Sequence, residues 1–206
     1  MDHPRQPVST FEVLYFGDSL TAGSVLPPDQ KSSVWTNLVE QSSRGKFRAI
    51  NEGLGGRPTD SLPDFQKALQ NHGGVIDLLV IALGGNDARD ISGNCVPHAI
   101  KNLRAMITLA QAARPQIPLL LVGPANIRKD TLGPTKPIAN ERDQNLRDLN
   151  DAYEKLAQEI SCQFVSLYGV IPSACLAADG VHPDAEGNKP IAEKMLEALT
   201  QLTSVC

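Results

Sequence analysis

The stretch 13-VLYFGDSLTAG-23 decides the fold, because an apolar run ends abruptly there at a polar turn. Residues 13–16 are apolar throughout, as in a strand covered on both faces of a sheet. Gly17 ends the run, and Asp18 and Ser19 follow directly. Ser19 is either the capping residue of a strand-to-helix turn or a nucleophile held at the end of a buried strand. The rest of the chain favours the second interpretation.

The composition limits the class of protein. The chain has 206 residues, of which 41% are hydrophobic, enough for one large core. A net charge of −4 without a Lys/Arg cluster argues against a nucleic-acid or anionic-membrane partner. The longest apolar run, residues 75–83, is too short to cross a bilayer. We therefore expect a single domain over residues 1–206, with a flexible tail over residues 1–10.

The first ten residues and the cysteines bear on localisation. The segment 1-MDHPRQPVST-10 is polar and lacks the apolar core of a signal peptide, so we expect a cytoplasmic protein unless another export route operates. The four cysteines form no CxxC pair and have no zinc-like spacing: Cys95, Cys162, Cys175 and Cys206. Free thiols are the simplest interpretation, and a bridge between Cys162 and Cys175 is the alternative for an exported protein.

Short apolar runs alternate with helical patterns along the chain. The expected strands are residues 12–16, 47–51, 76–83, 118–122 and 163–167, and the expected helices lie near 33–43, 60–70, 97–113, 141–160 and 186–203. The fourth helix has the clearest apolar stripe, at positions 146, 149, 153, 156 and 160. The alternation predicts an α/β fold, a three-layer α/β/α sandwich around a five-stranded parallel sheet of flavodoxin-like order 2-1-3-4-5.

Polar, glycine-rich segments follow four of these strands. They are residues 17–19, 51–59, 84–87 and 178–188. Each could be an ordinary turn on its own. Ligands of such sheets bind beyond the carboxyl ends of the strands, where all four segments are expected to meet. The sequence therefore predicts a functional site at this edge.

A nucleophilic serine needs a base, and the base needs a third group that orients it. The sequence offers four histidines: His3, His72, His98 and His182. His3 lies in the polar tail, His72 at the amino end of an expected strand and His98 at the start of an expected helix. His182 lies in a loop with Asp179 three residues before it, close enough for the carboxylate to turn back onto the imidazole. Asp179 and His182 are thus the candidate partners of Ser19.

The same segments hold donors for the oxyanion that forms during acyl transfer. The N–H of Ser19 lies at the start of a helix, where amide groups are free and the dipole favours negative charge. A glycine within residues 53–56 can bring its N–H close to a substrate. Asn86 can donate from its side-chain amide.

Four motifs occur in order along the chain: "FGDSLTAG", "NEGLGGRPT", "GGND" and "DGVH". With them the chain resembles the SGNH hydrolases, also called the GDSL esterase/lipase family. The resemblance implies that Ser19 is the nucleophile, His182 the general base and Asp179 the group that orients it. It also implies an oxyanion hole made by the N–H of Ser19, the N–H of Gly56 and the side chain of Asn86. Gly53 and Gly55 compete with Gly56 for this role.

The implied activity is that of a serine esterase acting on a small-molecule ester without a cofactor or metal ion. The rim segments are rich in Pro, Gly and charged residues, which predicts a shallow polar pocket and short acyl groups, acetyl to butyryl. An acyltransferase or thioesterase with the same triad is the alternative, and a non-catalytic binding module is another. A metal enzyme is a weaker rival, with Asp18, Asp179, His182 and Asp184 as ligands.

Further residues near the predicted site have simpler expected roles. Asp18 and Asp87 are expected to hold turns, and Trp35 to lie in the core. Arg57 is expected either to touch the substrate or to be exposed. The segment 124–140 is long for a connection and is expected to shape the pocket or to form a contact in a homo-oligomer.

Overall fold

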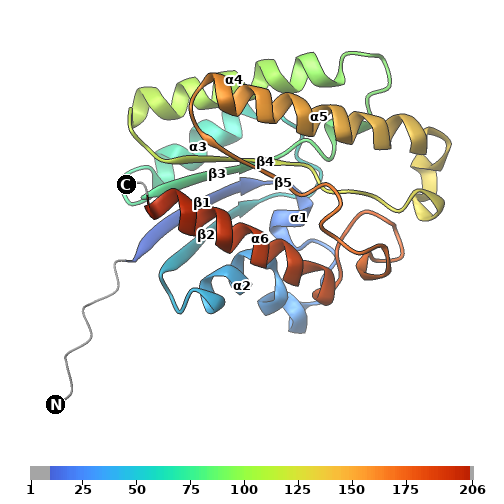
Figure 1. Cartoon of the computed structure of the whole chain (residues 1–206), viewed down its shortest axis with the longest axis horizontal. Coiled ribbons are helices and arrows are strands. Elements are labelled where there is room, and N and C mark those ends of the chain that lie inside the picture. Colours follow the sequence, from blue (N-terminus) through green and yellow to red (C-terminus); the bar gives the residue numbers. More distant parts are fainter. Residues whose placement is uncertain (1–9, 205–206) are drawn as a thin grey trace.

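The computed structural model describes residues 10–204. The predicted tail over 1–10 therefore lies outside the described residues except for its last position, as do His3 and Cys206. The sheet consists of five parallel strands: β1 (Phe11–Gly17), β2 (Phe47–Gly53), β3 (Leu78–Ala82), β4 (Leu119–Gly123) and β5 (Gln163–Ser166). Their order is β2-β1-β3-β4-β5, which confirms the predicted topology (Figure 1).

The helices between the strands also agree with the sequence pattern. They are α1 (Ser19–Ala22), α2 (Trp35–Ser42), α3 (Leu62–His72), α4 (Cys95–Ala113), α5 (Ala139–Glu159) and α6 (Ala185–Ser204). The bounds of the five predicted helices differ from the expected ones by at most two residues. The helix expected to start at Ser19 is the single turn of α1. The short 3-10 helices were not predicted, because so few residues carry no periodic pattern.

Helices cover both faces of the sheet. One core lies between the sheet and α3, α4 and α5, and the other between the sheet and α2 and α6 (Figure 1). Leu14 and Phe16 of β1 point into the first core and Val13 and Tyr15 into the second, and all four are fully buried. This is why residues 13–16 are apolar without alternation. Trp35, predicted to lie in the core, is 1% exposed and packs edge-on against Tyr15.

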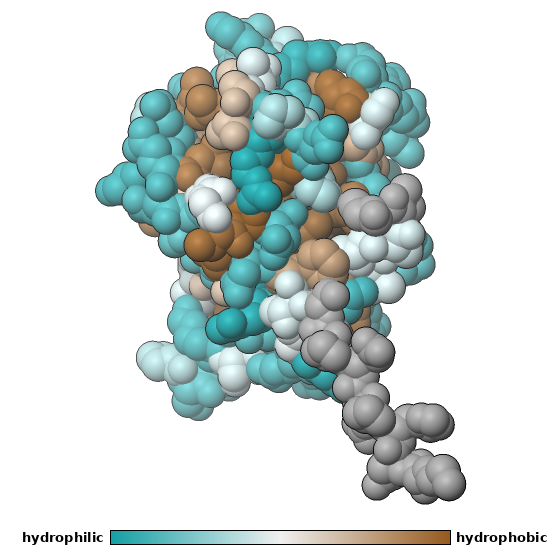
Figure 2. Space-filling view, turned by 90° about the vertical axis from the view of Figure 1, so that its left-hand side faces the viewer, coloured by the Kyte–Doolittle hydropathy of each residue, from teal (hydrophilic) through white to brown (hydrophobic). Residues whose placement is uncertain are grey.

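The two edges of the sheet differ in character. The amino ends of the strands lie at the left of Figure 1, and Figure 2 looks onto this side, where apolar and polar side chains are intermixed. The carboxyl ends lie at the opposite edge, which carries the four glycine-rich segments. Within residues 10–204, no helix is both long enough and apolar enough to cross a bilayer.

Candidate active site

Ser19 is the first residue of α1, immediately beyond the end of β1. Asp18 is the N-cap of this helix, and its Oδ1 accepts the N–H of Leu20 at 2.9 Å. Burial raises the pKa of Asp18 to about 6. A Cβ on Gly17 would lie 2.0 Å from Thr21 Oγ1, so only glycine allows this tight entry into the helix. Because Asp18 caps the helix, the hydroxyl of Ser19 is available for another partner.

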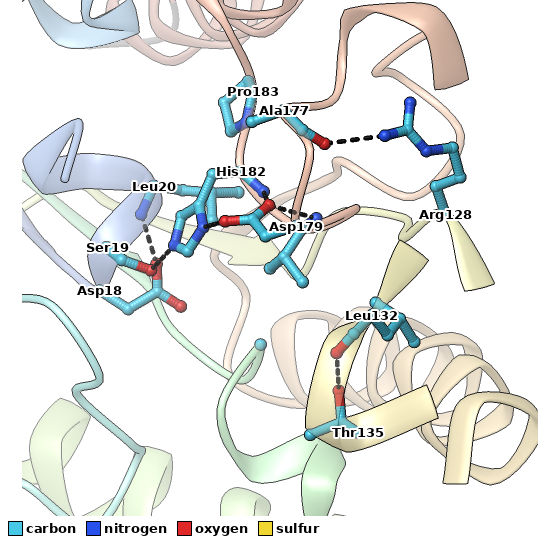
Figure 3. Close-up of polar contacts among 12 residues, drawn as sticks. Asp18, Ser19, Leu20, Arg128, Leu132, Thr135, Ala177, Asp179, His182 and Pro183 are labelled. Carbon is cyan, nitrogen blue, oxygen red and sulfur yellow. Dashed lines mark hydrogen bonds and ion pairs between the residues drawn. The ribbon is translucent and has the colours of Figure 1, made fainter. Parts of the chain in front are cut away.

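That partner is His182 (Figure 3). The Nε2 of His182 lies 2.8 Å from Ser19 Oγ, and its Nδ1 lies 2.6 Å from Asp179 Oδ2. The second carboxylate oxygen of Asp179 accepts the N–H groups of Val181 at 2.9 Å and of His182 at 3.0 Å. Burial alone would raise the pKa of Asp179, but these hydrogen bonds outweigh it and lower the pKa below its usual value. The structure thus brings the three predicted residues into one hydrogen-bonded chain.

The loop that carries Asp179 and His182 is fastened to the segment 124–140. Arg128 Nη2 donates to Ala177 O at 2.9 Å, and Arg128 N donates to Gly180 O at 2.7 Å (Figure 3). Arg128 Nη1 donates to Ser173 O at 3.0 Å. Gly180 has φ of +70°, and a Cβ there would lie 2.5 Å from Arg128 O. This role of Arg128 was missed, since nothing in its local sequence indicates a contact about fifty residues away.

The oxyanion-hole candidates lie on neighbouring loops. Asn86 Nδ2 donates to Arg57 O at 3.1 Å, which holds Asn86 beside the residue that follows Gly56. The N–H of Gly53 already donates to Asn51 Oδ1 at 2.9 Å, so Gly53 is not available as a donor. Within residues 10–204 the N–H groups of Gly55 and Gly56 donate no hydrogen bond. Gly56 has φ of +78°, a backbone conformation that favours glycine.

The expectation that Arg57 is exposed was wrong. Its side chain is buried, donates to Gly17 O at 2.8 Å and to Glu52 O, and stacks on the ring of Phe16 at 4.1 Å. Arg57 therefore ties β1 to the segment that follows β2. The sequence concealed this because an arginine next to a proline in a turn is usually exposed.

The other polar candidates have structural contacts. Asp87 accepts the N–H of Thr59 at 3.0 Å, so it holds a turn as predicted. His72 pairs with Glu52 at 2.7 Å. Asp184 accepts the N–H of Gly187 at 2.8 Å at the start of α6.

Residues 10–204 also bear on the two alternatives that the sequence left open, a metal site and a disulfide bridge. No group of three or more His, Cys, Asp or Glu side chains there is placed to hold a metal ion, including the four residues of the rival metal site. Cys95, Cys162 and Cys175 are free thiols, so the alternative bridge between Cys162 and Cys175 is not formed.

A cavity lies next to the segments that carry Ser19 and His182. Asp18 and Leu20, the neighbours of Ser19, and Val181, the neighbour of His182, contribute to its wall. The volume of this cavity is about 40 Å³. The other wall residues are mostly apolar and include Leu83, Val122, Ile127, Leu146 and Leu167. The prediction of a polar pocket was therefore wrong for this cavity. The strand ends and the segment 124–140 turn apolar side chains into it.

Solved structures of similar proteins share this fold. A carbohydrate acetylesterase family member from Sinorhizobium meliloti aligns with a TM-score of 0.77 at 23% identity, over 94% of this chain and 99% of that one. The aryl esterase of M. smegmatis aligns with a TM-score of 0.79 at 22% identity, over 94% and 100%. A lipolytic G-D-S-L family member from Veillonella parvula aligns with a TM-score of 0.70 at 20% identity, over 92% and 98%.

Comparison of the sequence with protein-family models identifies the family. No curated protein matches the chain. The family model described as the GDSL-like lipase/acylhydrolase family matches residues 15–189, which span all four motifs. The chain therefore belongs to the GDSL-like lipase/acylhydrolase family and is a serine-dependent carboxylic ester hydrolase.

Proposed function

We propose that the enzyme hydrolyses esters of short acyl groups, acetyl to butyryl, with Ser19, His182 and Asp179 as its catalytic triad. The observation that carries this proposal is the pair of short contacts from Ser19 Oγ to His182 Nε2, 2.8 Å, and from His182 Nδ1 to Asp179 Oδ2, 2.6 Å. Nucleophile, base and orienting carboxylate are then within direct hydrogen-bond reach.

In the first half of the reaction, Ser19 Oγ attacks the acyl carbon while its proton passes to His182 Nε2. Asp179 accepts the Nδ1–H, fixes the tautomer and stabilises the imidazolium. The carbonyl oxygen becomes an oxyanion that accepts hydrogen bonds from the N–H of Ser19, the N–H of Gly56 and the amide of Asn86. When the tetrahedral intermediate collapses, the carbon–oxygen bond to the alcohol breaks, and the alcohol leaves with the proton from His182.

In the second half, water attacks the acyl-enzyme. His182 Nε2 takes a proton from the water as its oxygen bonds to the acyl carbon. The bond to Ser19 Oγ then breaks, and His182 returns the proton to the serine. The products are the carboxylic acid and the free enzyme.

The size of the cavity supports a short acyl group. A cavity of about 40 Å³ is small and favours short acyl groups. The methylenes of longer chains would stay in water, and each would lose about 0.8 kcal/mol.

A covalent probe tests the triad. Wild-type enzyme treated with a fluorophosphonate should carry the label on Ser19, located by peptide mass spectrometry. Ser19→Ala should lose the label and about 10⁴- to 10⁶-fold of kcat. Ser42→Ala, at an exposed serine at the end of α2, is the matched control and should behave as wild type. Undiminished hydrolysis by Ser19→Ala would refute the assignment.

A substrate series tests the acyl length. The kcat/KM values for p-nitrophenyl acetate, butyrate, octanoate and palmitate should be largest at acetate or butyrate. A maximum at octanoate or beyond would refute the short-chain proposal and leave the triad standing.

A further inference from the structure

Arg142 lies in the first half of α5 and is almost completely buried, with 2% of its surface exposed. Its Nη1 donates to Thr135 Oγ1 at 3.2 Å, and its Nη2 reaches Gly85 O at 3.5 Å. Among residues 10–204, its Nε has no hydrogen-bond partner and no carboxylate lies within ion-pair distance of its guanidinium. In this part of the chain, the hydrogen-bond acceptors of the buried guanidinium are therefore neutral groups.

A buried charge without a counter-charge is costly. Burial and the positive charge of Arg89 lower the pKa of Arg142 to about 10, while Asp179 and Asp18 act in the opposite direction. Asp18 shares the cavity wall with Arg142, but its Oδ1 is occupied by the N–H of Leu20. An anion bound in the cavity would supply the negatively charged hydrogen-bond partner that Arg142 lacks within residues 10–204.

The location of Arg142 links this charge to the reaction. Arg142 lines the same cavity as Asp18, Leu20 and Val181, which are the sequence neighbours of Ser19 and His182. The same cavity wall therefore contains Arg142 and the residues that flank Ser19 and His182.

A second arginine stands near the first. Asn145, one turn after Arg142 on α5, donates to Ala88 O at 3.1 Å and to Asp90 O at 2.9 Å. These bonds hold α5 against the 3-10 helix Asp87–Arg89, which follows Asn86. Arg89 is exposed, and its side chain makes no hydrogen bond or ion pair within the described part of the chain. Arg89 is thus near enough for its charge to lower the pKa of Arg142, and within residues 10–204 neither guanidinium pairs with a carboxylate.

We propose that Arg142, assisted by Arg89, binds a carboxylate at the far end of the acyl group, so that the enzyme prefers half-esters of malonic and succinic acid to neutral esters of the same shape. This inference rests on the proposed function, because it assigns the acyl group to the cavity beside Ser19. The carboxylate would accept hydrogen bonds from Arg142, including its unpartnered Nε–H. The methylenes between the two carbonyl carbons would lie against apolar residues such as Leu20 and Leu146.

Two pairs of isosteric esters test the preference in the wild type. Monoethyl malonate is compared with ethyl isovalerate, and monoethyl succinate with ethyl 4-methylpentanoate, by release of ethanol. After correction for the hydroxide-catalysed rates, kcat/KM should be at least about tenfold larger for each half-ester, as expected for hydrogen bonds between charged groups. A wild-type preference for the neutral esters would overturn the proposal.

Variants separate recognition from structural support. Arg142→Met should lower kcat/KM for the half-esters at least about tenfold and change it little for the neutral esters. Arg147→Met, at an exposed arginine on the same helix that pairs with Asp143, is the matched control and should keep the wild-type ratio. Equal losses on both kinds of ester would mean that Arg142 only supports the fold, which would overturn the proposal.

Arg89→Met gives an independent answer if Arg142→Met does not fold. Because Arg89 is exposed, its replacement should leave the fold intact and lower the half-ester ratio severalfold. An unchanged ratio for this variant, with Arg142→Met unfolded, would overturn the proposal.

A third substrate pair distinguishes the two ends of the ester. Acetoxyacetate, with its carboxylate in the alcohol part, is compared with isobutyl acetate. A preference for acetoxyacetate without one for the half-esters would overturn the assignment to the acyl group. If wild type hydrolyses neutral short esters but does not prefer half-esters, only this inference fails. If it hydrolyses none of these esters, the proposed function fails as well.

Discussion

The two sides of the candidate active site are built differently. The side of the proposed nucleophile, here the nucleophile side, comprises residues 17–24, 51–59 and 84–90, at the carboxyl ends of β1, β2 and β3. The side of the proposed base, here the base side, comprises residues 173–184, part of the long connection between β5 and α6. The nucleophile side is fixed where the sheet ends, whereas the base side depends on contacts with a separate segment.

On the nucleophile side, side chains bind the ends of the strands to one another. Asn51 donates to Thr21 O at 2.7 Å, Arg57 donates to Gly17 O at 2.8 Å, and Asp87 accepts the N–H of Thr59 at 3.0 Å. The first two bonds connect the ends of the neighbouring strands β1 and β2, and the third connects the segments after β2 and β3, which flank β1. The position of Ser19 is therefore set by the pairing of the sheet itself.

On the base side, the main support comes from Arg128 of the segment 124–140. It donates to four carbonyl groups of the loop, those of Ser173, Leu176, Ala177 and Gly180. A short backbone bond within the loop, from Ala177 N to His182 O at 2.8 Å, adds local order. The comparison teaches that the proposed base depends mainly on one arginine from a separate segment, whereas the proposed nucleophile is held by several side chains at the ends of the strands.

Removing a donor on the nucleophile side should have the largest effect of three changes that probe this comparison. Asn86→Ala should lower kcat about a hundred- to a thousandfold, or about 2.7–4 kcal/mol, because the bond strengthens as the oxyanion forms. KM should change little. Steady-state kinetics on p-nitrophenyl acetate measure both constants, with Asn102→Ala on α4 as control. A fall of less than threefold would mean that Asn86 only holds the turn beside Arg57.

The buried carboxylate of the nucleophile side should appear in the pH dependence of stability. Because burial raises the pKa of Asp18 to about 6 in the folded protein, the folded state binds this proton more strongly than the unfolded state. The contribution of Asp18 to stability is therefore most favourable below about pH 4 and falls as the pH rises through about 6.

Asp18→Asn keeps the oxygen that caps α1 but removes this titration. The free energy of unfolding of the variant relative to wild type should rise by up to about 3 kcal/mol between about pH 4 and pH 7. Urea unfolding at intervals of one pH unit measures the difference, and Asp60→Asn, at an exposed carboxylate of the same side, is the control. A difference that does not vary with pH would contradict the raised pKa.

The smallest effect is expected on the base side. Arg128→Met removes the contacts with Ser173 O and Ala177 O and should lower kcat about ten- to a hundredfold, because His182 is then less well placed. KM should stay near its wild-type value, a separation that a general loss of folded protein would not produce. Arg104→Met, at an exposed arginine paired with Glu159, is the control. An unchanged kcat would show that the base side holds its own geometry.

Much of the molecule could be predicted from local sequence. The apolar run 13–16, the stripe along residues 146–160 and the glycines after each strand report burial and turn geometry, which depend on neighbours in the chain. The strand order followed from the succession of strand and helix patterns, because right-handed connections leave few topologies. The resemblance to the GDSL family, confirmed by the match over residues 15–189, likewise rests on short contiguous motifs.

Tertiary structure alone decided the roles of the three arginines. Arg57, Arg128 and Arg142 each lie in or next to a polar, exposed-looking segment, yet Arg57 and Arg142 are buried and Arg128 supports a loop about fifty residues away. The apolar lining of the cavity was hidden for the same reason, since Leu20, Val122 and Ile127 meet only after the strands pair. Local sequence reports the backbone and the burial of regular elements, whereas the partner of a long, charged side chain depends on which distant segments the fold brings within its reach.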